Sequence, residues 1–411
     1  MPTSEAPTSN MLEQLQSARA ESDRFFDIIA RAAMHERPID ARHRIIFYVG
    51  HLDGFDSIQI CREGLGIKSM DQPLDDLFQA GIDPDSQHLP ADTPSDWPSL
   101  DQVRSYVTRC RRKVDNYLER APSEVVQMSL EHRLMHLETL AYMFHNLSYE
   151  AKNAPRTSSA VESGQLLGEN EWRSIPAGDT VLGKRQDECF GWDNEFQEMQ
   201  CSVPEFRIQR FSVTNGDYLR FVQDGAPLPH FWMLRGGALH YRGMFEEFPL
   251  PLDCPVYVTM YEAEAYACWS GKSLPTEAQF HRAAFGTPGG KEKKFPWGDA
   301  EPGPGVEYGN FDFARWEPES VYAKSAGDSS FGVSQLVGNG WQWTSTLFAP
   351  FPGFKPRSTY PGYSANFFDG EHFVLKGGSP RTAARLLRRS FRNWFRRDYP
   401  FVYATFRCVE N

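Results

Sequence analysis

The stretch LEHRLMHLETLAYMFHNL, residues Leu130–Leu147, decides the fold of the N-terminal half of the chain. Its apolar residues recur at helical spacing, which predicts an α-helix with a buried face. Two of its three histidines, His132 and His136, are four residues apart. Residues with that spacing lie on one face of a helix, one turn from each other. The pattern therefore predicts a helix that directs two imidazoles into the interior of a domain.

Three further helices are predicted around this one, because apolar residues recur at helical spacing in three other segments. The four predicted helices span residues 11–33, 40–65, 98–121 and 122–147, with Asp40, Ser99 and Ser123 as expected N-caps. Four helices of this length predict a bundle. A long connection rich in Asp and Pro, residues 70–98, separates the second helix from the third. Connections of that length are usually functional or disordered.

The composition changes after residue 155, which indicates a second domain. Residues 1–155 are expected to form the helical domain and residues 156–171 a polar linker. Residues 172–411 are rich in Gly, Pro and aromatic residues and predict short strands with little helix. The expected fold class is therefore α+β.

His51 supplies a third imidazole, because it lies in the apolar stretch IIFYVGHLDGF of the second predicted helix. The interiors of bundles are where facing helices assemble metal sites. Three neutral imidazoles suit zinc or iron and leave positions open for water or substrate. Glu138 is offset from His136 by two residues and is expected to support the site without binding metal. The alternative is that these histidines are ordinary core residues, as expected for His43 and His145.

Charge and cysteine content exclude several classes of function. The chain has 411 residues and a formal net charge of -11, which argues against nucleic acid or an anionic membrane as the main partner. No apolar run reaches the length of a membrane span, and no signal peptide is evident at the start. The seven cysteines include no CxxC pair, so reduced thiols and a cytoplasmic location are expected.

The C-terminal half resembles the formylglycine-generating-enzyme fold, the C-type-lectin-like domain also called the sulfatase-modifying-factor domain. The resemblance rests on six motifs in order: FSVTNGDYLRFV, YEAEAYACWSGKSLPTEAQF, FPWGDAEP, LVGNGWQWTST, VLKGGSP and RRSFRNWF. Only Cys408 lies in the C-terminal region where the formylglycine enzyme has a cysteine pair, so that activity is not expected. Gln342 stands where many members carry a calcium-binding glutamate, which leaves calcium binding open.

The whole chain resembles the ergothioneine-biosynthetic sulfoxide synthases, which join a DinB-like four-helix bundle to this second domain. RHRIIFYVGHLDGFD, LPADTPSDWPS, EHRLMHLETLAYM, FGWDNEF and RRSFRNWF carry the resemblance. It implies iron(II), Fe(2+), held by His51, His132 and His136. The implied reaction uses O2 to join a thiol to C2 of the imidazole of hercynine, Nα-trimethylhistidine, as a sulfoxide.

The resemblance also implies substrate-binding residues near the C-terminus. Trp394 is expected to face the trimethylammonium group by cation–π attraction, with Asn393 beside it. Arg392 and Arg396, within a cluster of five arginines, are expected to hold the donor's carboxylate. Phe395 replaces the Asp of members that use γ-glutamylcysteine, which points to free cysteine as donor. Tyr360 and Tyr363, from a YxxYS stretch, are the implied proton donors, while core packing is the competing explanation for Trp394 and for either tyrosine.

Several other functions remain compatible with the sequence. A selenoneine synthase, which joins hercynine to a selenosugar, would share both domains and the iron site. A non-catalytic binding module and a zinc-dependent thiol transferase are the alternatives from other classes. The expected partners are small molecules, with no nucleic acid and no membrane, and a homo-oligomer stays open. Because metal ligands and the cation wall come from different halves, the active site is expected between the two domains.

Overall fold

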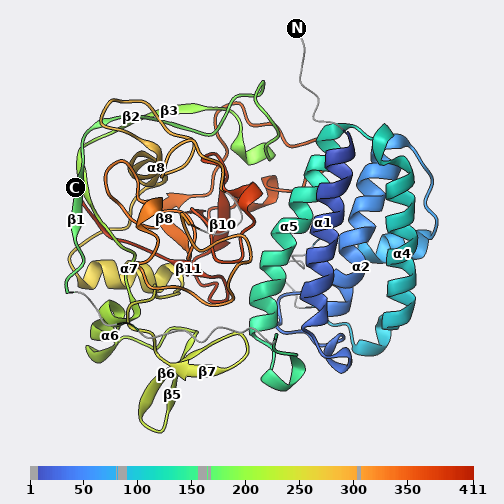
Figure 1. Ribbon diagram of the computed structural model, residues 1–411, viewed down its shortest axis with the longest axis horizontal. Helices are drawn as coiled ribbons and strands as arrows, with labels where there is room; N and C mark the ends of the chain where they lie inside the picture. The colour runs from blue at the N-terminus through green and yellow to red at the C-terminus, as the bar shows by residue number, and fades with distance from the viewer. Residues whose placement is uncertain (1–7, 80, 82–89, 156–163, 165–167, 303–306) are drawn as a thin grey trace. The chain divides into compact units, whose positions relative to one another are not determined.

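The computed structural model describes residues 8–79, 81, 90–155, 164, 168–302 and 307–411 of the chain (Figure 1). It divides into two compact units, Met1–Thr157 and Ser158–Asn411, called here the N-terminal and the C-terminal unit. The first is helical and the second is built mainly from short strands, so the predicted α+β class is confirmed. The linker predicted over 156–171 lies largely outside the described residues. No described helix is long and apolar enough to cross a membrane.

Four long helices form the N-terminal unit and run side by side in Figure 1. They are α1 (Thr8–Asp27), α2 (Ile45–Asp56), α4 (Leu100–Tyr117) and α5 (Ser123–His145). α2 packs against α4 and α5, and α1 packs against α5. α2 continues without a break into one π-helical stretch, Ser57–Glu63, so the second predicted helix has its expected C-terminal extent. The predicted four-helix bundle is confirmed.

The expected helix starts were right once and wrong twice. Ser99 caps α4, and its side chain and that of Gln102 form a reciprocal capping box. Asp40 caps nothing, because α2 begins only at Ile45, whose amide donates to the carbonyl of Glu36 at 3.1 Å. Ser123 is already the first residue of α5 and accepts no capping hydrogen bond.

The connection between α2 and α4 contains one helix that the sequence analysis missed, α3 (Gln72–Phe78). Its start carries ordinary helix signals. The Asp71 side chain accepts from the amide of Leu74 at 3.4 Å, and Pro73 lies in the first turn. Residues 80 and 82–89 of this connection lie outside the described residues.

A buried layer of charges joins the four long helices. The guanidinium of Arg133 on α5 is fully buried and lies 2.8 Å from Asp53 and 2.6 Å from Asp56 on α2. Its other nitrogen donates to Ser22 of α1 at 3.0 Å, and Arg111 of α4 reaches Asp53 at 3.0 Å. Removing one partner of such a buried set leaves an uncompensated charge, so the layer specifies how α2 and α5 align.

Short sheets and three helices form the C-terminal unit. The largest sheet has the order β10-β9-β8-β11, with β8 (Trp341–Leu347), β9 (His372–Lys376), β10 (Asn393–Arg396) and β11 (Ala404–Thr405). The other strands are β1 (Trp172–Ile175), β2 (Gly178–Leu182), β3 (Met199–Val203), β4 (Phe206–Gln209), β5 (Trp232–Arg235), β6 (Ala238–Arg242), β7 (Glu247–Pro249) and β12 (Val409–Glu410). The helices are α6 (Asn215–Gln223), α7 (Met260–Trp269) and α8 (Glu277–Phe285), and α8 packs on β2, β3, β8 and β9.

Gln342 takes part in a buried polar network instead of facing a cation. Its side-chain oxygen accepts from Arg407 Nε at 3.1 Å, and its nitrogen donates to Ser212 Oγ at 2.9 Å. The Arg407 guanidinium is fully buried and also donates to the carbonyls of Gln209, Arg210, Ser334 and Gln335. The amide of Gln342 is thus used to satisfy a buried guanidinium, which must be fully hydrogen-bonded to be tolerated there.

Candidate functional site

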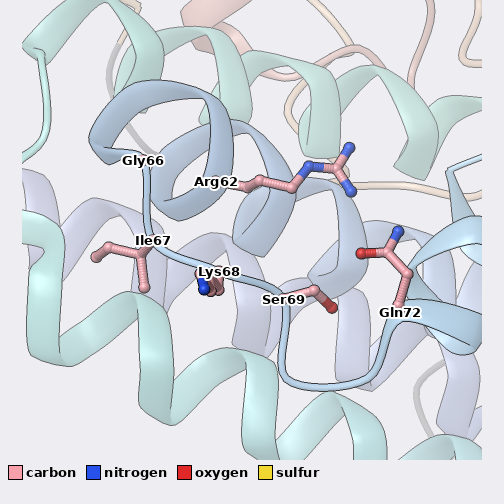
Figure 2. Close-up of a pocket in the computed structure, with 6 residues that line it drawn as sticks. All are labelled: Arg62, Gly66, Ile67, Lys68, Ser69 and Gln72. Carbon is pink, nitrogen blue, oxygen red and sulfur yellow. The ribbon is translucent and has the colours of Figure 1, made fainter.

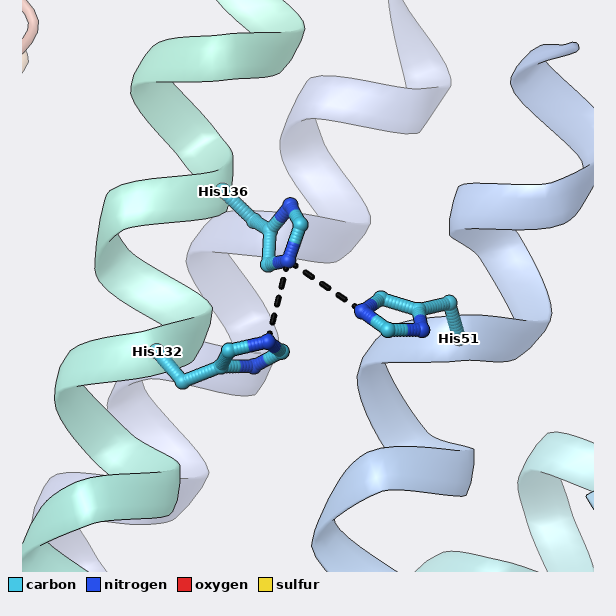
Figure 3. Close-up of side chains that lie close together, drawn as sticks. All are labelled: His51, His132 and His136. Atoms are coloured by element: carbon cyan, nitrogen blue, oxygen red, sulfur yellow. Dashed lines mark hydrogen bonds between the residues drawn. The ribbon is translucent and has the colours of Figure 1, made fainter. Parts of the chain in front are cut away.

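The three histidines predicted from the sequence converge inside the N-terminal unit (Figure 3). His51 comes from α2, while His132 and His136 come from one face of α5. The Nε2 atom of His136 lies 3.2 Å from that of His51 and 3.0 Å from that of His132. All three side chains are buried, and among the described residues they form the one such group that could hold a metal ion.

Burial keeps these imidazoles in the form that binds metals. It lowers the pKa of His51 to about 4 and the pKa of His132 and His136 well below the usual value. The neighbouring imidazoles act in the same direction, since a second positive charge at this distance is unfavourable. At neutral pH each ring is therefore neutral and offers a nitrogen lone pair.

The spacing of the nitrogens fits a shared cation. His51 Nδ1 lies 2.7 Å from the carbonyl oxygen of Phe78, which can only accept, so Nδ1 carries the proton and Nε2 does not. The bare Nε2 of His51 is thus directed at Nε2 of His136, where it can accept a proton or bind a cation that the three nitrogens share. Two nitrogens bound to one metal at about 2.1 Å and a right angle would be about 3.0 Å apart. The measured 3.0 and 3.2 Å match that arrangement.

Aromatic rings hold two of the imidazoles in place. Phe55 stacks on His132 with ring centroids 3.5 Å apart and planes 10° from parallel. Phe47 stacks on His51 at 4.8 Å. Such packing limits the rotation of both ligand side chains, which is a condition for a precise metal site.

The other residues considered in this unit lie outside the group. His43 is half-buried, contacts the carbonyl of Gly81 at 2.8 Å and packs against Phe47 with tilted rings, 4.2 Å between centroids. His145 is buried at the last residue of α5, and Glu138 is buried on α5, but neither belongs to the metal-ligand group. The pocket drawn in Figure 2 contains none of the predicted site residues. Its volume is about 460 Å³, and it is lined by Arg62, Gly66, Ile67, Lys68, Ser69 and Gln72.

In the C-terminal unit, Trp394 lies in a cluster of aromatic rings. It stacks on Phe348 with centroids 4.3 Å apart and planes 7° from parallel. Tyr363 meets it edge-on at 5.3 Å, and Phe367 lies at 5.5 Å. The indole remains only partly buried. A ring held in this way presents a rigid aromatic surface of the kind that attracts an organic cation.

Of the two candidate tyrosines, Tyr363 is the one that contacts Trp394. Its ring also stacks on Trp192 at 3.9 Å, while Tyr360 lies 6.0 Å from Tyr363. Ser364, the next residue, is anchored by a hydrogen bond of 2.5 Å from its hydroxyl to Asp193. The rings of Trp192, Phe348 and Phe367 were missed from the sequence, because no spacing rule links segments so far apart.

The side chains of Phe395 and Trp394 lie on opposite faces of β10. Both lie on β10, and successive side chains of a strand point to opposite faces. Phe395 stacks on Tyr399 at 5.1 Å, away from the Trp394 cluster. Asn393 is on the Phe395 face, and its side chain accepts from the amide of Trp394 at 2.9 Å.

Four of the five clustered arginines have acidic partners. Arg388 binds Glu195 in a two-pronged contact, Arg389 binds Glu292, and Arg397 binds Glu264. Arg392 is buried, lies 3.1 Å from Glu277 and donates to the carbonyl of Ala349 at 3.0 Å. Among these five described arginines, only the exposed Arg396 has a side chain without a hydrogen bond or ion pair.

Comparison with known proteins agrees with this architecture. Residues 159–411 match the sulfatase-modifying factor enzyme 1-like domain. The chain is 33% identical over 372 residues to a hercynine oxygenase of Mycolicibacterium thermoresistibile, covering 80% of this chain and 78% of the relative. It is 34% identical to a hercynine oxygenase of Mycobacterium tuberculosis, covering 73% and 75%.

A longer relative is the ergothioneine biosynthesis protein 1 of Neurospora crassa, which is 25% identical over 92% of this chain and 55% of its own length. The two bacterial relatives match along most of both chains, and the domain match covers more than half of this one. The chain is therefore an enzyme of the hercynine oxygenase family.

Proposed function

We propose that this enzyme is a sulfoxide synthase that uses iron(II) and O2 to join the sulfur of cysteine to C2 of the hercynine imidazole. The observation that carries the proposal is the convergence of three buried, neutral imidazoles in a chain of the hercynine oxygenase family. His51, His132 and His136 would hold the iron. When bound, iron(II) supplies redox chemistry toward O2 and open positions for the reacting thiolate and imidazole.

The absence of a carboxylate from the ligand set suits an anionic thiol substrate. Three neutral ligands leave the full charge of the metal uncompensated, so a thiolate is attracted more strongly than it would be beside an aspartate or glutamate. Burial supports the same preference, because it keeps the three imidazoles neutral at physiological pH. The histidines would thereby favour the thiolate form of the donor.

Trp394 is proposed to bind the trimethylammonium group of hercynine. That group has no N–H to donate, so an aromatic surface is the natural receptor for it. Phe348 covers one face of the indole in a near-parallel stack, and the ring is still partly exposed. Tyr363, whose ring meets Trp394 edge-on, is proposed as the proton donor in preference to Tyr360, whose ring lies 6.0 Å from that of Tyr363.

Arg396 is proposed to bind the carboxylate of the sulfur donor. It lies two residues after Trp394 on β10, so both side chains are on the same face of the strand. Its guanidinium is exposed and, unlike the buried Arg392, has no acidic partner among the described residues. Arginine's planar fork suits a carboxylate.

The proposal is tested by turnover of the purified full chain loaded with iron(II). The enzyme is given hercynine and O2 together with cysteine, γ-glutamylcysteine or a selenosugar at equal concentration. Formation of the hercynyl cysteine sulfoxide as the main product supports it. Preferred turnover of the selenosugar would assign selenoneine synthesis instead, and activity with zinc in the absence of O2 would indicate a thiol transferase.

A further inference from the structure

The helix α3 lies directly against the part of α2 that carries His51. Gly50 and Gly54 flank His51 on α2, one helical turn apart. A Cβ atom added at Gly50 would lie 2.4 Å from the Phe78 ring, closer than any real side-chain contact. A Cβ at Gly54 would lie 3.0 Å from the hydroxyl of Tyr106 and 3.4 Å from Cβ of Phe78. Gly50 therefore lets the Phe78 ring of α3 lie against the backbone of α2, and Gly54 leaves room for the Tyr106 hydroxyl of α4.

This approach brings the C-terminal end of α3 to His51. The carbonyl of Phe78, the last residue of α3, accepts from His51 Nδ1 at 2.7 Å. Carbonyls at a helix C-terminus have no partner within the helix and carry the negative end of its dipole, which makes them strong acceptors. The hydrogen bond places the proton on Nδ1 and leaves the Nε2 lone pair directed at the nitrogens of α5.

Three contacts hold α3 in this position from the side of α4. The Tyr106 hydroxyl donates to Asp75 of α3 at 2.7 Å, and both side chains are buried. The Tyr106 ring also stacks on Phe78 at 5.4 Å, and Phe78 is fully buried. Nearer the surface, Arg109 of α4 donates to Asp71 at 2.7 Å. A chain of contacts thus runs from Tyr106 through Asp75 and α3 to the imidazole of His51.

We propose that α3 is a clamp that fixes the proton and the ring orientation of His51, and that Tyr106, Asp75 and Gly50 are positioning residues for the metal centre. The effect of these residues on a metal centre rests on the proposed function, whereas the hold of α3 on the His51 ring does not. It also assigns a purpose to α3, one of the described parts of the long connection between α2 and α4.

Single-atom and conservative variants of the full chain test the clamp, with Co²⁺ as the probe. Affinity is measured by competition with a chelator, followed by the visible absorption of the bound ion. Tyr106→Phe, which removes only the hydroxyl, should weaken Co²⁺ binding by about ten- to hundredfold, the usual effect of losing an outer partner of a metal ligand. Gly50→Ala should act at least as strongly, and adding Phe78→Ala should relieve it, because the ring is removed while the carbonyl stays.

Tyr117→Phe serves as the matched control, because it removes a hydroxyl from the same helix α4, away from α3, and should have no effect. Asp75→Asn keeps an oxygen that accepts from Tyr106 and should bind Co²⁺ more tightly than Asp75→Leu, which keeps none. Equal affinities for Tyr106→Phe and Tyr117→Phe would overturn the clamp.

The ring nitrogen of His51 that carries the proton can be measured separately, and a loss of protein stability alone would not change it. In metal-free protein labelled with [15N]histidine, the wild type should show a His51 Nδ1–H signal, assigned by its loss in His51→Ala. Tyr106→Phe should shift His51 toward the Nε2–H form, whereas a wild type already protonated on Nε2 would refute the inference. A wild type that binds no metal but keeps this Nδ1–H signal would refute the proposed function and leave the clamp standing.

Discussion

The Nε2 atoms of His132 and His136 lie 3.0 Å apart, although the two residues are a full helical turn from each other on α5. Nitrogen atoms at that distance repel unless a proton or a cation lies between them. Because burial keeps both rings neutral, and His51 brings a third nitrogen with its lone pair inward, a metal ion satisfies all three at once.

The first prediction is that His136→Ala abolishes metal binding. His136 lies between the other two imidazoles and contacts both of them. Its loss leaves only two ligands for the metal ion. The loss in affinity should exceed the roughly 10- to 100-fold effect of removing an outer partner. Metal content after dialysis against trace iron(II) measures it, with His43→Ala as the control. Full metal occupancy in His136→Ala would contradict the assignment of the site.

The second prediction concerns Trp394→Ala, which should raise the KM for hercynine. The cation–π contribution is on the order of 0.5–2 kcal/mol, a factor of roughly 2 to 30. Trp394→Phe should recover part of the loss, because a smaller aromatic face remains. The KM for the sulfur donor should change less. An unchanged KM for hercynine in Trp394→Ala would show that the indole is only a packing residue.

The metal-ligand group could be predicted from the sequence because helical spacing places two of its residues by itself. His132 and His136 follow from the four-residue repeat, and His51 follows from its place in an apolar helix. The capping of α4 by Ser99 was equally local. The histidine pair and the cap depend on neighbours within one turn of chain, which is the range over which sequence patterns act, whereas His51 meets the pair only through packing of α2 against α5.

Features that depend on distant segments were not predictable in this way. Helix α3 has only seven residues, too few for a helical repeat, and its stability comes from contacts with α2 and α4. From the sequence, both Arg392 and Arg396 were expected to bind the donor's carboxylate. Only the fold shows that Arg392 forms an ion pair with Glu277. Likewise, Phe395 and Trp394 point to opposite faces of β10, and this could be known only once the residues were seen to form a strand.

The third prediction separates Arg396 from its neighbour. Arg396→Ala should raise the KM for cysteine by about tenfold or more, since a charge-assisted contact with a carboxylate contributes about 1.5–3 kcal/mol. Arg397→Ala is the matched control, because Arg397 pairs with Glu264 and lies just beyond the end of β10. Steady-state kinetics at saturating hercynine measures both. Equal effects of the two variants would count against a specific carboxylate contact at Arg396.

The same assay addresses Phe395. A γ-glutamyl donor carries an additional ammonium group, and burying it against a phenyl ring without a hydrogen bond is unfavourable. Cysteine is therefore expected to outcompete γ-glutamylcysteine in a mixture of the two. Phe395→Asp should narrow that preference if the residue contacts the donor. No change in preference would be the expected result if Phe395 serves only to pack on Tyr399.

The last prediction is that the C-terminal unit loses stability in acid through Glu292. Burial alone would raise the pKa of Glu292, but His281, the Thr180 hydroxyl and the Val181 amide lower it to about 2. Arg389 adds a contact of 2.6 Å. Because the folded pKa lies below the ordinary value of about 4.3, the carboxylate stabilises the fold above that value. This contribution is lost as the pH falls from about 4.3 toward 2.

His281 reinforces the effect at somewhat higher pH. Burial lowers the pKa of this fully buried imidazole, so its neutral form favours the fold above about pH 6.5, and protonation of the unfolded chain weakens the fold below it. Thermal unfolding measured between pH 7 and pH 3 should therefore show a steeper loss in the wild type than in Glu292→Gln. The glutamine keeps an acceptor for Thr180 but carries no charge to lose. Parallel curves for the two proteins below pH 4.5 would mean that Glu292 is not the group whose protonation weakens the fold.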